Sequence, residues 1–179
     1  MTTPAPEFSR VLRLDQAVSN AAGAHIAAIA EECAALAKRF GFASIDRLDA
    51  DYTLTEENGS PVARGQLRAA LAQHCVATFE PVAETVDVPF AIRFEQEGDV
   101  SQDEEFELSE EECDVQFYEG GAIDIGEAVA QTLALSVEPY PRAPNADNWL
   151  RERGVLTEDQ AGPFAALAAL TAKKDKQSR

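Results

Sequence analysis

The side chains that could carry nucleophilic chemistry are few in this sequence. It contains three cysteines, Cys33, Cys75 and Cys113, and two histidines, His25 and His74. His74 directly precedes Cys75, but neighbouring residues of a strand point to opposite faces of a sheet, so the two are not placed as a thiol and its base. No GxSxG motif, the signature of a serine nucleophile elbow, is present. We therefore expect Cys75 to be a packed residue and the protein not to be an enzyme. The alternative is a small cytoplasmic hydrolase or transferase that uses a carboxylate or Cys75.

Patterns that would hold a metal ion or a phosphate group are also missing. A zinc site needs about four thiolate or imidazole ligands at short spacing, whereas the three cysteines are far apart and form no CxxC pair. The glycines of EGGAIDIG, residues 119–126, are not followed by the GK[ST] of a phosphate-binding loop, and Asp124 and Glu127 would repel an anion there. We expect no metal, no cofactor and no small-molecule substrate.

The charge balance indicates which partners the chain favours. Its 179 residues include 32 acidic and 15 basic side chains, which gives a net charge of −17. This charge repels RNA at long range and attracts basic partners, ribosomal proteins included. No stretch has the roughly 20 apolar residues of a membrane helix, and the N-terminal MTTPAPEFSR lacks the features of a signal peptide. We expect a cytoplasmic protein without a membrane partner.

Alternating apolar residues predict strands in the first half of the chain. The segments are 8–14, 45–54, 62–75 and 82–94, and a shorter strand is expected at 115–118. Asn58-Gly59-Ser60 predicts a hairpin turn, because Asn and Gly tolerate a positive φ. Pro89 predicts an edge position or a bulge in its strand, since proline has no N–H to donate.

Two helices are predicted from apolar residues at helical spacing and from their end signals. The first covers Ala30–Phe40 and ends at Gly41, a favourable C-terminal cap. The second starts at Asp124, which can accept hydrogen bonds from the first free amides, and Glu127 is expected to complete a capping box. The apolar face of this helix is formed by Ile125, Val129, Leu133 and Val137.

The second helix lies between two breaks in the chain. Gly120 and Gly121 predict a tight turn before it, and Pro139 and Pro141 end it. Pro-Tyr-Pro cannot continue a helix because proline removes an N–H and its ring clashes with the preceding turn.

An acidic segment and a polar tail complete the chain. Residues 95–114 hold eleven acidic side chains and no lysine or arginine, which predicts a solvated loop. Residues 143–179 are predicted to form a polar, partly ordered tail with a short helix near 163–171. We expect residues 1–142 to form one α+β domain. Its core is a bent, mainly antiparallel sheet of about five to seven strands, or a partly open barrel, with two packed helices and a short C-terminal helix beyond it.

Four segments in a fixed order give the sequence a family resemblance. They are QHCVATFEPVAETVDVPFAIRF at 73–94, the acidic segment, FYEGGAIDIGEAVAQTLALSVEPYPR at 117–142, and the terminal PFAALAAL at 163–170. From about Ile45 onward the chain resembles the bacterial YceD family, the large ribosomal RNA subunit accumulation proteins. The most specific part is the middle segment, with its Ile-Asp-Ile helix start, its Thr-Leu-Ala-Leu run and its Pro-x-Pro end.

The resemblance implies a non-catalytic factor needed for accumulation or processing of the large-subunit ribosomal RNA. Such a factor would act by binding an assembly intermediate, a ribosomal protein or precursor RNA. Because of the charge of −17, we expect a basic ribosomal protein, or RNA partly neutralised by proteins, to bind better than free RNA. The expected family-motif or partner-binding residues are Cys75, Tyr118, Gly120, Gly121, Asp124, Glu127, Leu133, Pro139, Pro141, Pro163, Phe164 and Leu167.

The sequence departs from the family pattern at its cysteines. Many relatives carry a CxxC where this chain has Cys75-Val76-Ala77-Thr78, and some carry a second cysteine cluster where it has RAPNADNW, residues 142–149. If those cysteines bind a metal in relatives, this chain has lost the site. The resemblance then implies that Cys75 serves packing.

Overall fold

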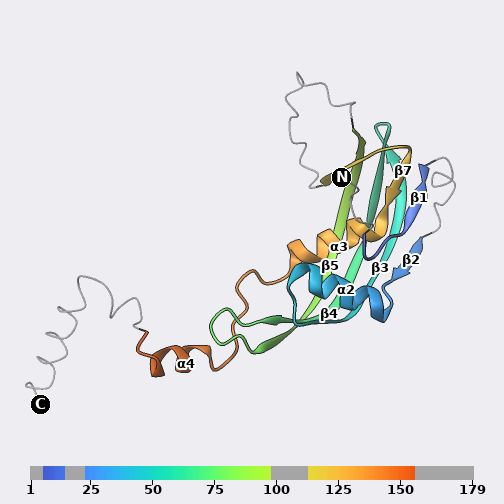
Figure 1. Cartoon of the computed structure of the whole chain (residues 1–179). Helices are drawn as coiled ribbons and strands as arrows, with labels where there is room; N and C mark the ends of the chain where they lie inside the picture. Colours follow the sequence, from blue (N-terminus) through green and yellow to red (C-terminus); the bar gives the residue numbers. More distant parts are fainter. Residues whose placement is uncertain (1–5, 15–22, 98–112, 156–179) are drawn as a thin grey trace, which may run out of the picture.

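The alternating segments form one five-stranded sheet with the strand order β2-β3-β4-β5-β6 (Figure 1). The computed structural model describes residues 6–14, 23–97 and 113–155. The strands are β2 (Ala24–Ala27), β3 (Ser44–Glu57), β4 (Ser60–His74), β5 (Pro81–Gln96) and β6 (Asp114–Tyr118). All neighbours are antiparallel except β5 and β6, which are parallel. A second, two-stranded sheet pairs β1 (Val11–Arg13) with β7 (Ala122–Asp124).

The three long predicted strands are confirmed as β3, β4 and β5. Strands β3 and β5 extend beyond the predicted segments at both ends, whereas β4 begins two residues earlier and ends at His74, so Cys75 lies in the turn and not in the strand. Asn58 and Gly59 make the tight turn between β3 and β4 with φ of 54° and 86°, as their residue types predict. Among the described residues Pro89 has the expected edge position, because it pairs with Gln66 of β4 and β6 pairs with β5 from Ile92 onward. The five-stranded sheet is open, so the protein is α+β and not a closed barrel.

Two helices pack on one face of this sheet (Figure 1). They are α2 (Ala30–Phe40), which ends at Gly41 with a left-handed φ of 73°, and α3 (Ile125–Ser136). Both helices turn an apolar side to the alternate residues of the three long strands, which produces one continuous core. Its largest fully buried side chains are Phe8, Phe94, Leu36, Leu48, Leu67, Ile123, Ile125 and Leu133.

Three elements differ from the sequence-based prediction. Strand β2 was not predicted, since its four residues show no pattern of their own and are held by pairing with Asp49–Tyr52 of β3. The segment 8–14 was predicted to be a strand, but only Val11–Arg13 is one. The polar segment after residue 142 contains a short helix, α4 (Ala146–Glu152), that was also not predicted.

The division into residues 1–142 and 143–179 stays a prediction, and the helix expected near 163–171 lies outside the described residues.

The N-terminal segment passes so close to α3 that no side chain fits between them. Phe8 is fully buried, and a Cβ added to Gly126 would lie 2.3 Å from the carbonyl oxygen of Phe8. The amide of Ile125 donates to the carbonyl oxygen of Arg10 at 3.2 Å. Gly126 therefore provides the space through which residues 8–10 cross the start of α3.

This close approach predicts an unusual response to Gly126→Ala. Glycine to alanine in a helix normally stabilises by about 0.5–1 kcal/mol, but here the added methyl group must displace backbone, so we expect a loss of about 1–3 kcal/mol. The free energy of unfolding in urea measures the effect. Gly23→Ala is the control, because its Cβ would meet nothing closer than 3.7 Å. A Gly126→Ala variant as stable as the natural protein would contradict the packing described above.

Candidate functional site

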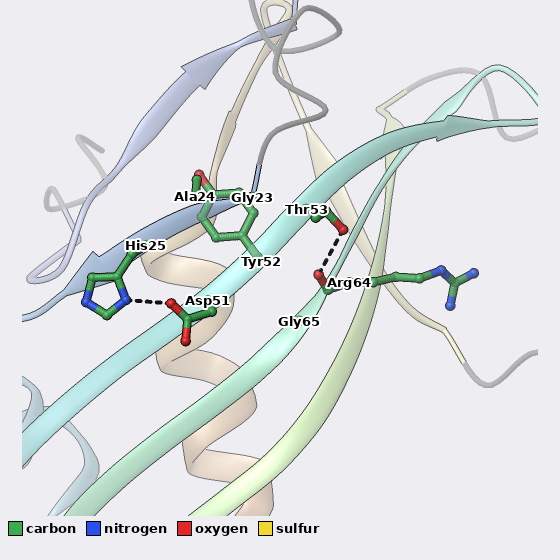
Figure 2. A pocket seen from close by; sticks show the side chains of 8 residues that line it. All are labelled: Gly23, Ala24, His25, Asp51, Tyr52, Thr53, Arg64 and Gly65. Atoms are coloured by element: carbon green, nitrogen blue, oxygen red, sulfur yellow. Dashed lines mark hydrogen bonds and ion pairs between the residues drawn. The ribbon is translucent and has the colours of Figure 1, made fainter.

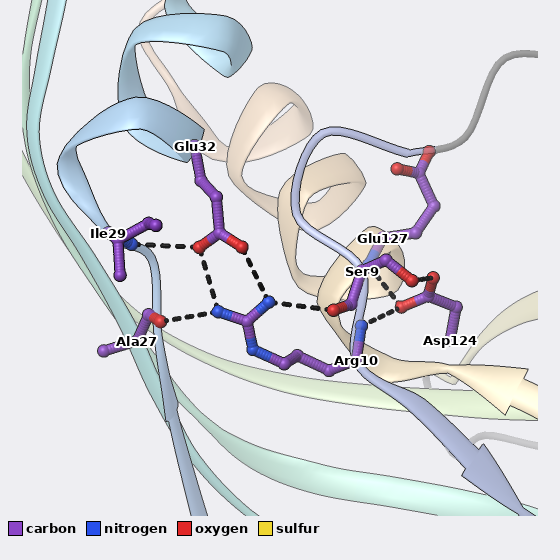
Figure 3. A network of polar contacts seen from close by, with 7 residues as sticks. All are labelled: Ser9, Arg10, Ala27, Ile29, Glu32, Asp124 and Glu127. Carbon is purple, nitrogen blue, oxygen red and sulfur yellow. Dashed lines mark hydrogen bonds and ion pairs between the residues drawn. The ribbon is translucent and has the colours of Figure 1, made fainter.

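The residues before α3 make a compact polar junction (Figure 3). Gly120 and Gly121 both have left-handed φ, 70° and 73°, and so form the predicted turn between β6 and β7. Asp124 is the N-terminal cap of α3 and accepts from the amide of Glu127 at 3.2 Å, as predicted. It also accepts from the Ser9 hydroxyl at 2.5 Å and from the Arg10 amide at 2.7 Å. Asp124 therefore holds the N-terminal segment as well as the helix.

Arg10 extends this junction to α2. Its guanidinium group donates to both carboxylate oxygens of Glu32, at 2.8 and 2.9 Å, and to the carbonyl oxygen of Ala27 at 3.1 Å. Hydrogen bonds from Arg10 hold the pKa of Glu32 below its ordinary value. Glu32 in turn accepts from the amide of Ile29, which precedes α2. One arginine thus ties the starts of both helices together.

The capping box predicted for Glu127 is not the arrangement found. Its carboxylate accepts two hydrogen bonds from Arg39 of α2, at 2.6 and 2.8 Å, and one from Gln131 at 2.8 Å. The bonds from Arg39 hold the pKa of Glu127 below its ordinary value. Glu127 links the two helices because a bidentate bond to arginine is stronger than a bond to a neutral backbone amide.

Cys75 lies at the tip of the hairpin between β4 and β5, and it is fully buried, as expected for a packed residue. Its sulfur accepts three backbone N–H groups, from Ala77 and Thr78 at 3.4 Å and from Ala143 at 3.2 Å. Ala143 and Ala146 pack around it in a small separate cluster. The start of the RAPNADNW segment, residues 142–149, therefore lies directly against Cys75.

The environment of Cys75 favours the thiolate. Burial by itself raises the pKa of the thiol, but the amide of Ala143, the Thr78 hydroxyl and the amides of Thr78 and Ala77 outweigh it and lower the pKa to about 6. Three N–H groups aimed at one atom stabilise a negative charge there. The sulfur is covered even though the hairpin tip projects from the body of the sheet (Figure 1).

His74 is not arranged as a base for this thiol. Its ring stacks on Phe79 with the centroids 4.4 Å apart, and its Nδ1 lies 3.3 Å from the carbonyl oxygen of Phe79. The sulfur of Cys75 has backbone partners instead. Within the described residues, no group of three His, Cys, Asp or Glu side chains is placed to hold a metal ion.

The Pro-Tyr-Pro segment joins the same hairpin tip. Pro141 is buried, and its carbonyl oxygen accepts from the amide of Val76 at 2.9 Å. Gln73 of β4 donates to the carbonyl oxygen of Glu138 at 2.9 Å and to the Glu84 carboxylate at 2.8 Å. The end of the α3 segment is thereby fastened to the ends of β4 and β5.

A shallow depression of about 410 Å³ opens beside β2 and β3 (Figure 2). Its polar groups already pair with one another: His25 Nδ1 lies 2.8 Å from the Asp51 carboxylate, and the Thr53 hydroxyl donates to the carbonyl oxygen of Arg64 at 3.4 Å. Hydrogen bonds from Arg68 and His25 lower the pKa of Asp51. The polar groups of this depression are therefore already occupied by one another. None of the residues predicted from the sequence lines it.

The residues predicted from the sequence thus fall into two separate groups. One surrounds the start of α3 and the other surrounds Cys75 and Pro141. Tyr118 and Leu133 pack in or against the main core, and Pro139 is exposed. Pro163, Phe164 and Leu167 lie outside the described residues. No helix in the part of the chain that the structure describes is long and apolar enough to span a membrane.

The fold and these two junctions define a small α+β protein whose described motif residues mostly serve as internal ties. The model of the family described as large ribosomal RNA subunit accumulation protein YceD matches residues 63–171, which is more than half of the 179 residues. The chain therefore belongs to the YceD family, as its sequence resemblance predicted. Searches of curated proteins and of solved structures found no significant match.

Sequence reasoning missed the exposed residues that stand beside the motif residues. Val76, Phe79 and Tyr140 are 58 %, 74 % and 74 % exposed. Phe79 also has a positive φ of 63°, which no residue type in Ala-Thr-Phe-Glu would have predicted. Exposure of an apolar side chain depends on which segments pack around it, so it could not be deduced from local pattern.

The sulfur environment predicts how Cys75 titrates. In the folded protein the thiolate should appear with a midpoint near pH 6, whereas in urea it should appear near the ordinary value of about 8.5. Because the folded pKa is the lower one, the thiolate stabilises the fold above about pH 8.5, and this contribution is lost as the pH falls through 6. Ultraviolet absorbance of the thiolate, compared with Cys75→Ser, measures the midpoint.

The control for this titration is Cys33→Ser. Burial raises the pKa of Cys33, so removal of this thiol should leave the low-pH transition unchanged. A folded protein in which the transition assigned to Cys75 stays at or above its value in urea would contradict the arrangement of three donors on the sulfur.

Proposed function

We propose that this protein is a cytoplasmic, non-catalytic ribosome-biogenesis factor. It is needed for accumulation or processing of the large-subunit ribosomal RNA, and it acts by binding an assembly intermediate, a ribosomal protein or precursor RNA. The observation that carries the proposal is the match of the YceD family model to residues 63–171.

The chemistry of the hairpin tip supports binding over catalysis. A thiol nucleophile needs a base within hydrogen-bonding reach and access to its substrate. Cys75 is fully buried, three backbone amides donate to its sulfur, and the neighbouring imidazole stacks on Phe79. No observation favours a hydrolase or transferase.

The arrangement of arginines supports a protein partner over free RNA. Arg10, Arg39, Arg47, Arg68 and Arg142 each lie within 3.2 Å of a carboxylate oxygen. A phosphate group would have to displace these carboxylates before it gained the same cation. Together with the net charge of −17, this favours basic ribosomal proteins, or RNA already coated by them, as the ligand.

The positions of the motif residues suggest how the binding surface is made. Asp124, Glu127 and Cys75 hold segments of the chain together, and most of their bonding capacity is used inside the protein. The groups left for a partner are their exposed neighbours and the helix predicted from Pro163, which lies outside the described residues. The motif residues thus hold the binding surface in place, and their exposed neighbours form it.

Depletion of the protein tests this proposal. We expect a lower ratio of large to small subunits in gradient profiles and a loss of mature large-subunit RNA, because an assembly step lacks its factor. Re-expression of the natural chain should restore both. Normal subunit ratios and normal RNA in depleted cells would overturn the proposal.

Purified material separates the two kinds of ligand. Precursor particles from depleted cells should bind the protein more tightly than the same RNA after its proteins are removed. Equal or tighter binding to the bare RNA would contradict the preference for a basic protein partner.

A further inference from the structure

The hairpin tip exposes three large apolar side chains beside a closely tied piece of backbone. Val76 and Phe79 lie in the turn itself, and Tyr140 lies in the segment whose next residue, Pro141, accepts a hydrogen bond from Val76. Exposed aromatic side chains that gather on one part of a surface commonly mark a site of protein contact. Because this backbone is held by its neighbours, a partner would meet a preformed surface.

Phe79 occupies an unfavourable backbone conformation for an aromatic residue. Its φ of 63° lies in the left-handed region, yet its side chain is 74 % exposed. Two hydrogen bonds close the turn around it, from the Phe79 amide to the carbonyl oxygen of Cys75 at 2.9 Å and from the Cys75 amide to that of Glu80 at 2.8 Å. Strain that the surrounding structure maintains at an exposed side chain is typical of functional positions.

Three carboxylates at or next to this turn have no ion-pair partner among the described residues. Glu80 accepts from the Asn145 side chain at 3.1 Å, Glu84 from Gln73 at 2.8 Å, and Glu138 from the Tyr140 amide at 3.3 Å. These donors are neutral, and no lysine or arginine among the described residues forms an ion pair with any of the three. The nearby Arg142 is already paired with Asp147 at 3.2 Å.

We propose that the tip surface, formed by Val76, Phe79 and Tyr140 with Glu80, Glu84 and Glu138, binds a basic segment of a partner protein. Arginine side chains of such a segment can stack on Phe79 or Tyr140 while they donate to the surrounding carboxylates. The inference rests on the proposed function, which makes a large-subunit ribosomal protein the source of this segment.

RNA is the less suitable occupant of the same surface. Bases could stack on the exposed rings, but the attached phosphates would approach three uncompensated carboxylates. Arg142, which follows Pro141 in the chain, is already paired with Asp147 and would have to leave it to offset that repulsion. The charges therefore favour a basic protein.

Photocrosslinking in the full chain locates the contact. Benzoylphenylalanine replaces Phe79 or Tyr140, and the probe is the mixture of proteins released by salt from purified large ribosomal subunits, tested beside the intact subunits. The control replaces Phe117, which is 57 % exposed on β6 at the opposite end of the sheet. We expect a crosslink to a protein segment rich in lysine and arginine from positions 79 and 140, and none from 117. A crosslink to RNA, an equal yield from 117, or no crosslink from 79 and 140 would overturn the proposal.

Affinity for a synthetic peptide of the crosslinked segment then tests the chemistry. Phe79→Asn should weaken binding at least about tenfold, and the fold should persist because asparagine tolerates a positive φ. Glu80→Gln with Glu138→Gln should weaken binding and reduce its dependence on salt. Leu135→Ser, at an 80 % exposed position of α3, is the control and should bind like the natural chain. Unchanged affinity in the Phe79 and glutamate variants would refute the proposal.

Failure here differs from failure of the proposed function. If depletion lowers large-subunit RNA and Phe79→Asn restores it fully, the tip surface is not the contact and the biogenesis role stands. If depletion changes nothing, the biogenesis role fails whatever the variants bind.

Discussion

One sulfur atom holds together two distant parts of this protein. Cys75 accepts N–H groups from its own turn and from Ala143, which lies 68 positions later in the chain. A buried N–H without a partner is costly, so the turn and the segment after α3 are stable in this arrangement only while the acceptor is present. The hydrogen bond between Val76 and Pro141 and the packing of Ala146 reinforce the same contact. At this end of the sheet, the contacts between the turn and the segment after α3 are centred on this sulfur.

The second junction, at the start of α3, also connects segments that are distant in the sequence, but it does so through charged side chains. Asp124, Arg10 and Arg39 connect the N-terminal segment to both helices. Each of these residues has polar atoms committed to contacts within the fold, and these contacts leave fewer polar groups at this junction for a partner. In the proposed function, the partner meets the surface that these ties position, where exposed rings and carboxylates without an ion-pair partner among the described residues lie at the hairpin tip.

Local sequence signals were sufficient wherever neighbouring residues determine structure. Period-two alternation and Asn58-Gly59 predicted the long hairpin, and Gly41 and Asp124 predicted the helix ends. They were insufficient wherever a feature depends on a contact with a residue far away in the sequence. Glu127 looked like part of a capping box because Arg39, 88 positions away, could not be known to lie beside it. Strand β2, the φ of Phe79 and the exposure of Tyr140 are likewise set by contacts that are distant in sequence.

Hydrogen exchange at the hairpin tip, followed by NMR in the natural chain and in Cys75→Ala, tests the central claim most directly. If the sulfur joins the two segments, the amides of Ala77, Thr78 and Ala143 should be protected in the natural chain and should exchange rapidly in the variant. The amides in the middle of β3, β4 and β5, away from the hairpin tip, should keep their protection. An Ala143 amide that remains protected after the sulfur is removed would show that another contact holds the segment, and it would contradict the account.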